Sequence, residues 1–117
     1  QVGPFVEVQK GVRIGKNCKI QSHSFICELV EILDDVFIGH GVMFINDTFN
    51  NGGPAQGNKD LWKGTLIKSN VSIGSNATIL PVEICENAVI GAGSVVTKNI
   101  EVPGIYAGNP AKLIREF

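Results

Sequence analysis

The sequence has little of what marks several large classes of protein. Its formal net charge is −1, with 10 Lys and Arg residues against 11 Asp and Glu residues. It therefore lacks the basic excess that binds nucleic acid by releasing counterions. No apolar run approaches the length of a bilayer span, and no signal-peptide pattern opens the chain. We expect neither a nucleic-acid partner nor membrane insertion.

Cysteine and histidine are also scarce. The three cysteines, an odd number, show neither zinc spacing nor a disulfide pattern, and such usage is typical of a reducing cytoplasm. We expect Cys18, Cys27 and Cys85 to pack as small side chains. A metal-dependent hydratase of the γ-class carbonic anhydrase kind would need three histidine ligands. The chain has only His23 and His40, so no metal site is expected.

A six-residue repeat runs through most of the chain. Its first positions are all aliphatic residues or Phe, and its fifth positions are small or β-branched. The hexads begin at Val2, Val8, Ile14, Ile20, Ile26, Ile32, Ile38 and Phe44, and resume at Leu61, Ile67, Ile73, Ile79, Ile84, Ile90 and Val96. The interval from Ile79 to Ile84 is one residue short, which predicts a deletion at the corner after Pro81.

The fourth position of the hexad indicates the geometry. It is Gly, Asn or Asp in 11 of the 14 complete hexads, and these residues tolerate a left-handed backbone at low cost. A turn between two inward-facing residues describes a short strand followed by a corner, and three such sides close a coil of about 18 residues. A period of six fits neither an α-helix nor the longer strands of a sandwich. The repeat predicts an all-β parallel β-helix of about five triangular coils.

Two segments depart from the repeat within this single domain. We expect coils over residues 2–49 and 61–100, an extruded active-site loop over 50–60, and a tail over 101–117. A loop of that length in a compact domain is functional or disordered. In the tail, Asn109 as a cap and Pro110 in the first turn predict a short C-terminal helix that runs through Ile114. The tail is equally suited to cap the open end of the coils.

Stacked coils bring distant residues together, because positions 18 apart lie roughly 4.8 Å from each other. Lys10, Glu28 and Asn46 are expected to form one outward column. Ser22 should lie below His40, with His23 diagonally beside it. His40 and Asn46 occupy the third positions of successive sides, flanking one corner of the prism, directly before the long interruption. That placement favours a functional site over a solvated surface histidine.

The hexads, "IGAGSVVTKNI" and the ending "GNPAKLI" resemble the hexapeptide-repeat acyltransferases that use acetyl-CoA. The stretches "GPFVEVQKG", "CKIQSHSFICE" and "DVFIGHGVMFINDTF" are similar to the N-acetyltransferases of nucleotide-linked amino sugars. The resemblance implies a left-handed β-helix and acetyl transfer to the amino group of a UDP- or dTDP-linked sugar in surface-glycan (lipopolysaccharide) biosynthesis. It also implies a cytoplasmic homotrimer, with acetyl-CoA as co-substrate between neighbouring prisms and the sugar beside the loop.

Acyl transfer to an amine needs a proton acceptor and a polarised thioester carbonyl. His40 is the candidate base, since histidine titrates closest to neutral pH, and Asn46 is the candidate to orient the amine or the thioester. The candidate substrate-binding residues are Lys10, His23, Glu28 and Asp47.

The candidate acetyl-CoA residues are concentrated in the second half of the chain. Ala92 and Gly93 leave an edge without bulk for the pantetheine arm, and Lys98 and Lys112 are candidates for the CoA phosphates. The turn Gly108–Asn109–Pro110 is expected to border the adenine. Trp62, the only Trp, either covers a ligand or packs the return of the loop.

Two other functions remain open at this point. An O-acetyltransferase acting on a sugar or serine hydroxyl would need a firmer general base, because a hydroxyl is a weaker nucleophile than a neutral amine. A non-catalytic β-helix scaffold would have no use for both the loop and the CoA-type tail.

Overall fold

The computed structural model describes residues 1–58 and 63–117, and every regular element within them is a β-strand. The strands are β1 (Glu7–Val8), β2 (Arg13–Ile14), β3 (Lys19–Ile20), β4 (Phe25–Ile26), β5 (Val30–Ile32), β6 (Phe37–Ile38), β7 (Met43–Phe44), β8 (Thr65–Ile67), β9 (Ser72–Ile73), β10 (Thr78–Ile79), β11 (Glu83–Ile84), β12 (Val89–Ile90), β13 (Val95–Val96), β14 (Gly104–Ala107) and β15 (Lys112–Glu116). No helix in the described part of the chain is long and apolar enough to cross a membrane.

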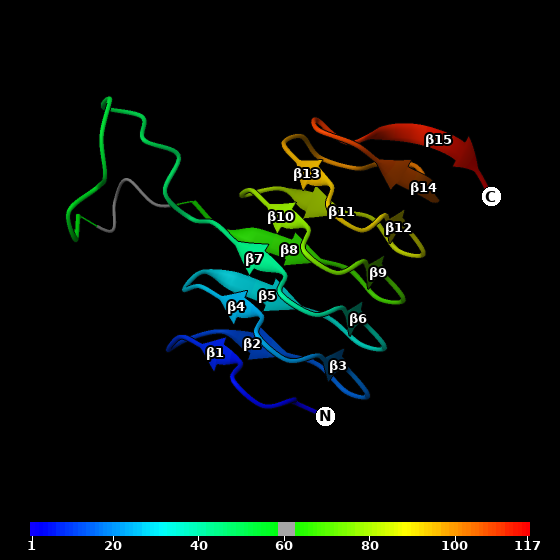
Figure 1. The fold of residues 1–117 in the computed structure, drawn as a ribbon, viewed down its shortest axis with the longest axis horizontal. Coiled ribbons are helices and arrows are strands. Elements are labelled where there is room, and N and C mark those ends of the chain that lie inside the picture. The colour runs from blue at the N-terminus through cyan, green and yellow to red at the C-terminus, as the bar shows by residue number, and fades with distance from the viewer. Residues whose placement is uncertain (59–62) are drawn as a thin grey trace.

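The strands form three sheets, and successive strands pass from one sheet to the next (Figure 1). We call them the β7 face (β1, β4, β7, β10, β13), the β8 face (β2, β5, β8, β11) and the β9 face (β3, β6, β9, β12, β14, β15). Pairing is parallel in all of them except between β14 and β15. The chain therefore winds into a triangular prism with its N terminus and its last strands at opposite ends (Figure 1).

The core is the column of first-position side chains that the repeat predicts. They point into the prism and are almost fully buried, namely Ile20, Ile26, Ile32, Ile38, Phe44, Ile67, Ile73, Ile79, Ile84, Ile90 and Val96. Burial of each such side chain contributes about 1.5–3 kcal/mol. The coils from Ile20 onward add similar contributions, whereas Val2 and Val8 in the first coil are 57% and 40% exposed, because no coil of the structure covers them from below.

The register of the strands confirms the stacking of positions 18 apart in the first half of the chain. Lys19 pairs with Phe37, and Arg13 pairs with Glu31. Across the interruption, Ile32 pairs with Ile67, so the coil register continues from β7 directly to β8. The hexad predicted at Leu61 lies outside the described residues, and this register requires no side between those two strands.

The corners carry the left-handed backbone that the fourth positions predict. Positive φ angles recur every six residues, at 5, 11, 17, 23, 29, 35 and 41 and again at 70, 76, 87 and 93. Three of these positions hold bulky side chains, Phe5, His23 and Leu29, for which the left-handed conformation costs about 1–2 kcal/mol each. The short side after Pro81 keeps the pairing of Ile84 with Ile67, as a deletion at that corner predicts.

The predicted C-terminal helix is wrong. Residues 104–116 form an antiparallel hairpin of β14 and β15, with a turn that contains a cis Asn109–Pro110 peptide. A helix this short is marginal in water, whereas the free edge of β14 offers hydrogen-bond partners to a second strand. The turn also binds the last strand of the β7 face, since the backbone N–H of Val95 donates to Gly108 O at 2.9 Å and that of Ala111 to Val95 O at 2.8 Å. The tail therefore caps the prism.

Close stacking of the coils makes a testable prediction at Gly74. A Cβ added there would lie 2.5 Å from the backbone nitrogen of Ala92, so Gly74→Ala must push two coils apart. We expect it to lower the free energy of unfolding by about 1–3 kcal/mol in urea titrations. Gly53→Ala is the control, because a Cβ there meets no atom within 4 Å. Equal stability of the two variants would contradict the packing described.

Candidate active site

One corner of the prism, between the β9 and β7 faces, brings together four of the predicted site residues, His23, His40, Ala92 and Gly93. We call it the histidine corner, and it consists of residues 22–23, 40–41, 75–76 and 92–93. A backbone hydrogen bond links each level to the next, from Gly41 N to Ser22 O at 3.0 Å, Asn76 N to His40 O at 2.8 Å and Gly93 N to Ser75 O at 2.8 Å. His40 and the Ala92–Gly93 pair therefore lie on one line, about 10 Å apart.

His40 is held from the coil below and from the coil above. Its Nδ1 lies 3.0 Å from Ser22 Oγ, and its backbone N–H donates to Ser75 Oγ at 3.1 Å. The side chain itself is exposed. Gly41 beside it has a φ of +64°, and a Cβ there would lie 2.5 Å from Asn76 Oδ1. The corner thus presents an oriented imidazole beside a glycine whose left-handed backbone disfavours larger residues.

The next corner, between the β7 and β8 faces, holds Asn46. We call it the loop corner, and it consists of residues 10–11, 28–29, 46–47, 63–64 and 98–99. Asn46 Nδ2 donates to Glu28 O at 3.1 Å, and the backbone N–H of Glu28 donates to Gln9 Oε1 at 3.0 Å. The predicted column of Lys10, Glu28 and Asn46 agrees with the strand register below it. Gln9 was missed, because its second position on a side gave no reason to single it out.

His40 and Asn46 do not flank one corner, and that part of the prediction is wrong. They lie at the two ends of β7, since His40 precedes Met43 and Asn46 follows Phe44. Their hydrogen-bond partners belong to different corners. The reason is geometric, because third positions of successive hexads are separated by one whole side of the prism. Within one chain the two side chains serve separate corners.

Asp47 shapes the start of the loop. Its carboxylate oxygens accept hydrogen bonds from the backbone N–H groups of Phe49 at 3.0 Å and Ala55 at 2.7 Å. The chain leaves the prism there (Figure 1), and the ring of Phe49 borders a hollow of about 300 Å³ lined by Gln9, Phe25, Cys27, Phe44, Ile45, Asn46 and Asp47. Asp47 therefore organises the start of the segment that leaves the prism beside this hollow.

The β7 face differs from the β8 face in the chemistry of its outer surface. Its outward side chains include Phe25, Met43 and Leu80, of which Met43 is 40% exposed. The corresponding positions of the β8 face carry Glu31 and Glu83. Between the histidine corner and the loop corner the β7 face is thus apolar at Phe25 and Met43, whereas β1 and β10 carry Glu7 and Thr78 in the same row.

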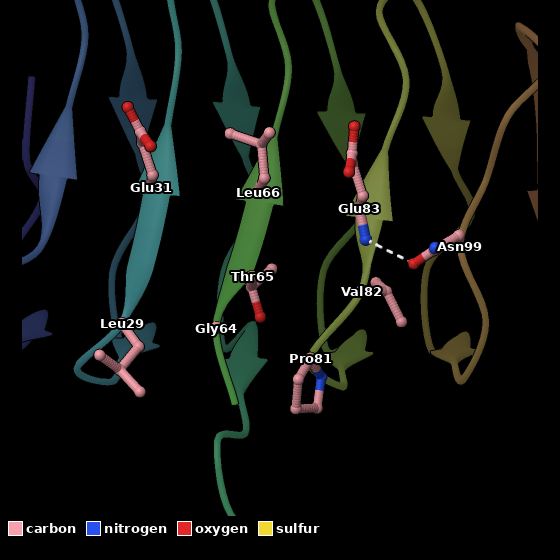
Figure 2. Close-up of a pocket in the computed structure, with 9 residues that line it drawn as sticks. All are labelled: Leu29, Glu31, Gly64, Thr65, Leu66, Pro81, Val82, Glu83 and Asn99. Atoms are coloured by element: carbon pink, nitrogen blue, oxygen red, sulfur yellow. Dashed lines mark hydrogen bonds between the residues drawn. The ribbon is translucent and has the colours of Figure 1, made fainter. Parts of the chain in front are cut away.

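A shallow groove of about 320 Å³ lies on the β8 face beside the loop corner (Figure 2). It runs between Glu31 and Glu83, and the backbone N–H of Glu83 donates to Asn99 Oδ1 at 2.9 Å. The carboxylate of Glu83 is paired with Lys68 Nζ at 3.0 Å. Among the described residues that line it, Leu29, Gly64 and Asn99 belong to the loop corner, and none is a predicted catalytic or cofactor residue.

The predicted acetyl-CoA residues fall into two sets. Ala92, Gly93 and the turn Gly108–Asn109–Pro110 belong to the histidine-corner side of the prism, where the Gly108 N–H donates to Ser94 Oγ at 3.3 Å. A Cβ at Gly93 would meet nothing within 4 Å, so this edge is open to a ligand. Lys98 lies on the loop corner, and Lys112 begins β15. Trp62 lies outside the described residues.

The cysteines have structural surroundings. Cys18 is buried, and its thiol donates to Leu33 O at 3.0 Å. Burial raises the pKa of Cys27 to about 11 and also raises the pKa of Cys85. Both remain thiols at neutral pH, which makes them poor nucleophiles and poor metal ligands. Residues 1–58 and 63–117 contain no group of three His, Cys, Asp or Glu side chains able to hold a metal ion.

Known proteins resemble this chain in sequence and in fold. The family described as the hexapeptide repeat of succinyl-transferase matches residues 65–98. The bifunctional protein GlmU of Streptococcus uberis is 38% identical over 116 residues, which cover 98% of this chain and 23% of GlmU. The chain therefore spans about a quarter of the length of the curated relatives it matches.

Two solved structures share the fold over nearly the whole chain. A hexapeptide-repeat-containing acetyltransferase from Vibrio cholerae, complexed with acetyl coenzyme A, has a TM-score of 0.85 at 26% identity and covers 99% of this chain and 67% of its own. A galactoside acetyltransferase in complex with coenzyme A has a TM-score of 0.80 at 32% identity, with coverages of 98% and 64%. The chain is thus similar in sequence and fold to hexapeptide-repeat acetyltransferases over nearly its whole length. Those neighbours are left-handed β-helices, and coils of opposite hand do not superpose, so the left hand is confirmed.

The contacts of Asp47 generate a prediction about the loop. Asp47→Ala removes the acceptor of two backbone N–H groups, so chymotrypsin should cut after Phe49 roughly tenfold faster, which corresponds to about 1.4 kcal/mol of lost hydrogen bonding. The coils should still unfold cooperatively. Glu31→Ala, which removes a carboxylate from the outer surface of β5, should leave the cleavage rate unchanged. An unaltered rate in Asp47→Ala would mean that other contacts hold the loop.

Proposed function

We propose that this chain transfers the acetyl group of acetyl-CoA to the amino group of a UDP- or dTDP-linked amino sugar, in the cytoplasmic assembly of surface glycans. The observation that carries the proposal is the histidine corner, where an oriented His40 shares an open backbone edge with Ala92 and Gly93. The relatives solved with acetyl-CoA and CoA support the cofactor. The sequence similarity of residues 3–49 to amino-sugar N-acetyltransferases supports the acceptor.

In this proposal the substrate amine attacks the thioester carbonyl while His40 Nε2 accepts its proton. Nε2 has a free lone pair only in the tautomer whose proton is on Nδ1, and Ser22 Oγ, 3.0 Å from Nδ1, is placed to accept that proton in a hydrogen bond. The C–S bond breaks as the amide forms, and the CoA sulfur finally takes the proton. Ser22 therefore acts as a positioning residue for the base.

The proposed enzyme is a homotrimer with composite sites. Suppose that the apolar β7 faces of three chains turn toward one threefold axis parallel to the prisms. One edge of each face then meets the opposite edge of the next face at the same coil height. His40 of one chain would approach Asn46 and the loop of its neighbour, and Lys98 would approach the edge at Ala92. In this arrangement His40 and Asn46, which lie at separate corners of a single chain, would come together at the interface between two chains.

A hydroxyl acceptor is the second candidate, and the similarity to a galactoside acetyltransferase favours it. The same imidazole and the same open edge would serve both reactions, so an assay has to separate them. Thiol release from acetyl-CoA should be followed with UDP- and dTDP-linked amino sugars, their hydroxyl analogues, free galactosides and serine. Turnover confined to the amino sugars supports the proposal, and turnover only with hydroxyl acceptors contradicts it.

Substitution of His40 tests its part in the reaction. His40→Ala should lower kcat by roughly 10²–10⁴, the usual range for general-base catalysis. Activity should recover in part as the pH rises, because more of the substrate amine is then neutral. Asn46→Ala should show a defect that persists at every pH, since it removes orientation and not proton transfer. Near-normal turnover of His40→Ala at pH 7 would assign the proton to the CoA sulfur or to water.

Mixed trimers test the composite site. His40→Ala and Asn46→Ala are each expected to be nearly inactive as pure trimers. When the two chains are unfolded together and refolded at equal amounts, about a quarter of the sites should regain both side chains by random association. A double variant mixed with wild type at the same ratio is the control for dilution. Absence of any recovery in verified mixed trimers would place both residues in one chain's site.

A further inference from the structure

Two exposed rings lie below His40, that of His23 on the histidine corner and that of Phe5 one coil further toward the N terminus. Phe5 and His23 stack with their ring centroids 5.1 Å apart and their planes tilted by 30°. Phe5 is 79% exposed, and His23 is exposed as well. The pair therefore presents an aromatic surface to solvent at a corner of the prism.

The backbone at these two residues is in a conformation that bulky side chains avoid. Phe5 has a φ of 59° and His23 a φ of 66°. The next two coils above His23 carry Gly41 and Asn76 at the same corner position. Gly and Asn adopt this conformation at low cost. Folding alone would be better served by Gly or Asn, and strained residues that the fold does not need are typical of functional sites.

Their position relative to His40 indicates what they would bind. His23 lies one coil and Phe5 two coils below the level of His40, about 5 and 10 Å along the corner. The open edge at Ala92 and Gly93 lies in the opposite direction along the same corner. A cofactor that approaches His40 from the Gly93 side leaves the Phe5 side free for the other substrate. In a nucleotide-linked sugar, a hexose, a pyrophosphate and a ribose or deoxyribose separate the reacting amine from the base, so the base has to lie well beyond the hexose, and the free direction along the corner leads to Phe5.

We propose that Phe5 and His23 form a stacking platform for the pyrimidine base of the nucleotide-linked sugar. The inference rests on the proposed function, and it assigns a base-binding subsite to the N-terminal end of the histidine corner. Aromatic side chains bind nucleobases through their π-faces and do so with little regard for base identity. The platform accounts for the two strained residues by giving their exposed rings a ligand.

Phe5→Asn is the sharpest test, because Asn suits the left-handed backbone and removes only the ring. Binding of UDP and of dTDP alone should be measured by calorimetry, so that the readout does not depend on catalysis. We expect wild type to bind one or both, and Phe5→Asn to weaken that binding roughly tenfold. The free energy of unfolding of the variant should equal or exceed that of wild type. Phe37→Asn, which removes a partly exposed ring from the outer surface of β6, is the control and should bind like wild type.

The outcomes separate this inference from the proposed function. Undiminished UDP and dTDP binding by Phe5→Asn, or no binding of either by wild type, would overturn the platform. Weaker binding of UDP or dTDP by Phe5→Asn, with unchanged binding by Phe37→Asn, supports the platform. This holds even if the acceptor assay shows that the acetyl group is transferred to a different acceptor. In the acetyl-transfer assay, the variant should raise KM for the nucleotide sugar and leave KM for acetyl-CoA unchanged. An equal rise in both KM values would assign Phe5 a structural role and contradict the inference.

Discussion

The structure depends on the backbone hydrogen bonds between successive coils. Each coil is too thin to bury its own apolar side chains, and only pairing with the next coil encloses the column of Ile residues. That pairing needs strands of matching position in every coil, so corners recur every six residues, and the shorter side after Pro81 is accommodated at a corner without loss of the register. Gly, Asn and Asp at the corners keep this length at low conformational cost. The arrangement of the candidate site follows from the same register, because it sets which residues share a corner.

The sequence predicted the prism and part of the candidate site because both are consequences of a local period. Counting 18 residues was enough to place Ser22 below His40 and Glu28 below Asn46. Ser75 was missed, although it lies above His40, because the interruption changes the offset to 35 residues and hides the stacking. It was also harder to predict at which corner of the prism a residue lies than to predict in which coil it lies. The repeat shows which residues stack in successive coils. It does not show the distance between two corners of the same coil, and that distance separates His40 from Asn46.

The two remaining differences have tertiary causes. Asn109 and Pro110 have the local chemistry of a helix start, yet the free edge of β14 offered the following residues a strand partner, and this longer-range pairing prevailed. Phe5 carried no signal in the sequence, because propensity rules do not expect a Phe at a left-handed corner. Only the backbone angles and the stacked ring of His23 distinguish it from an ordinary surface residue. The part played by Trp62 lies outside the described residues and stays a prediction.

The interruption between β7 and β8 leaves and rejoins the prism at the same place. The backbone N–H of Lys63 donates to Asn46 O at 3.0 Å, and that of Thr65 donates to Leu29 O at 3.0 Å, so the two stems are joined directly. Because the entropy of closing a loop rises only slowly with its length, the excursion can gain or lose residues while the coils beneath it keep their register. The segment between the two stems is therefore exchangeable: a longer, shorter or different segment can be inserted at this corner without a change to the coils.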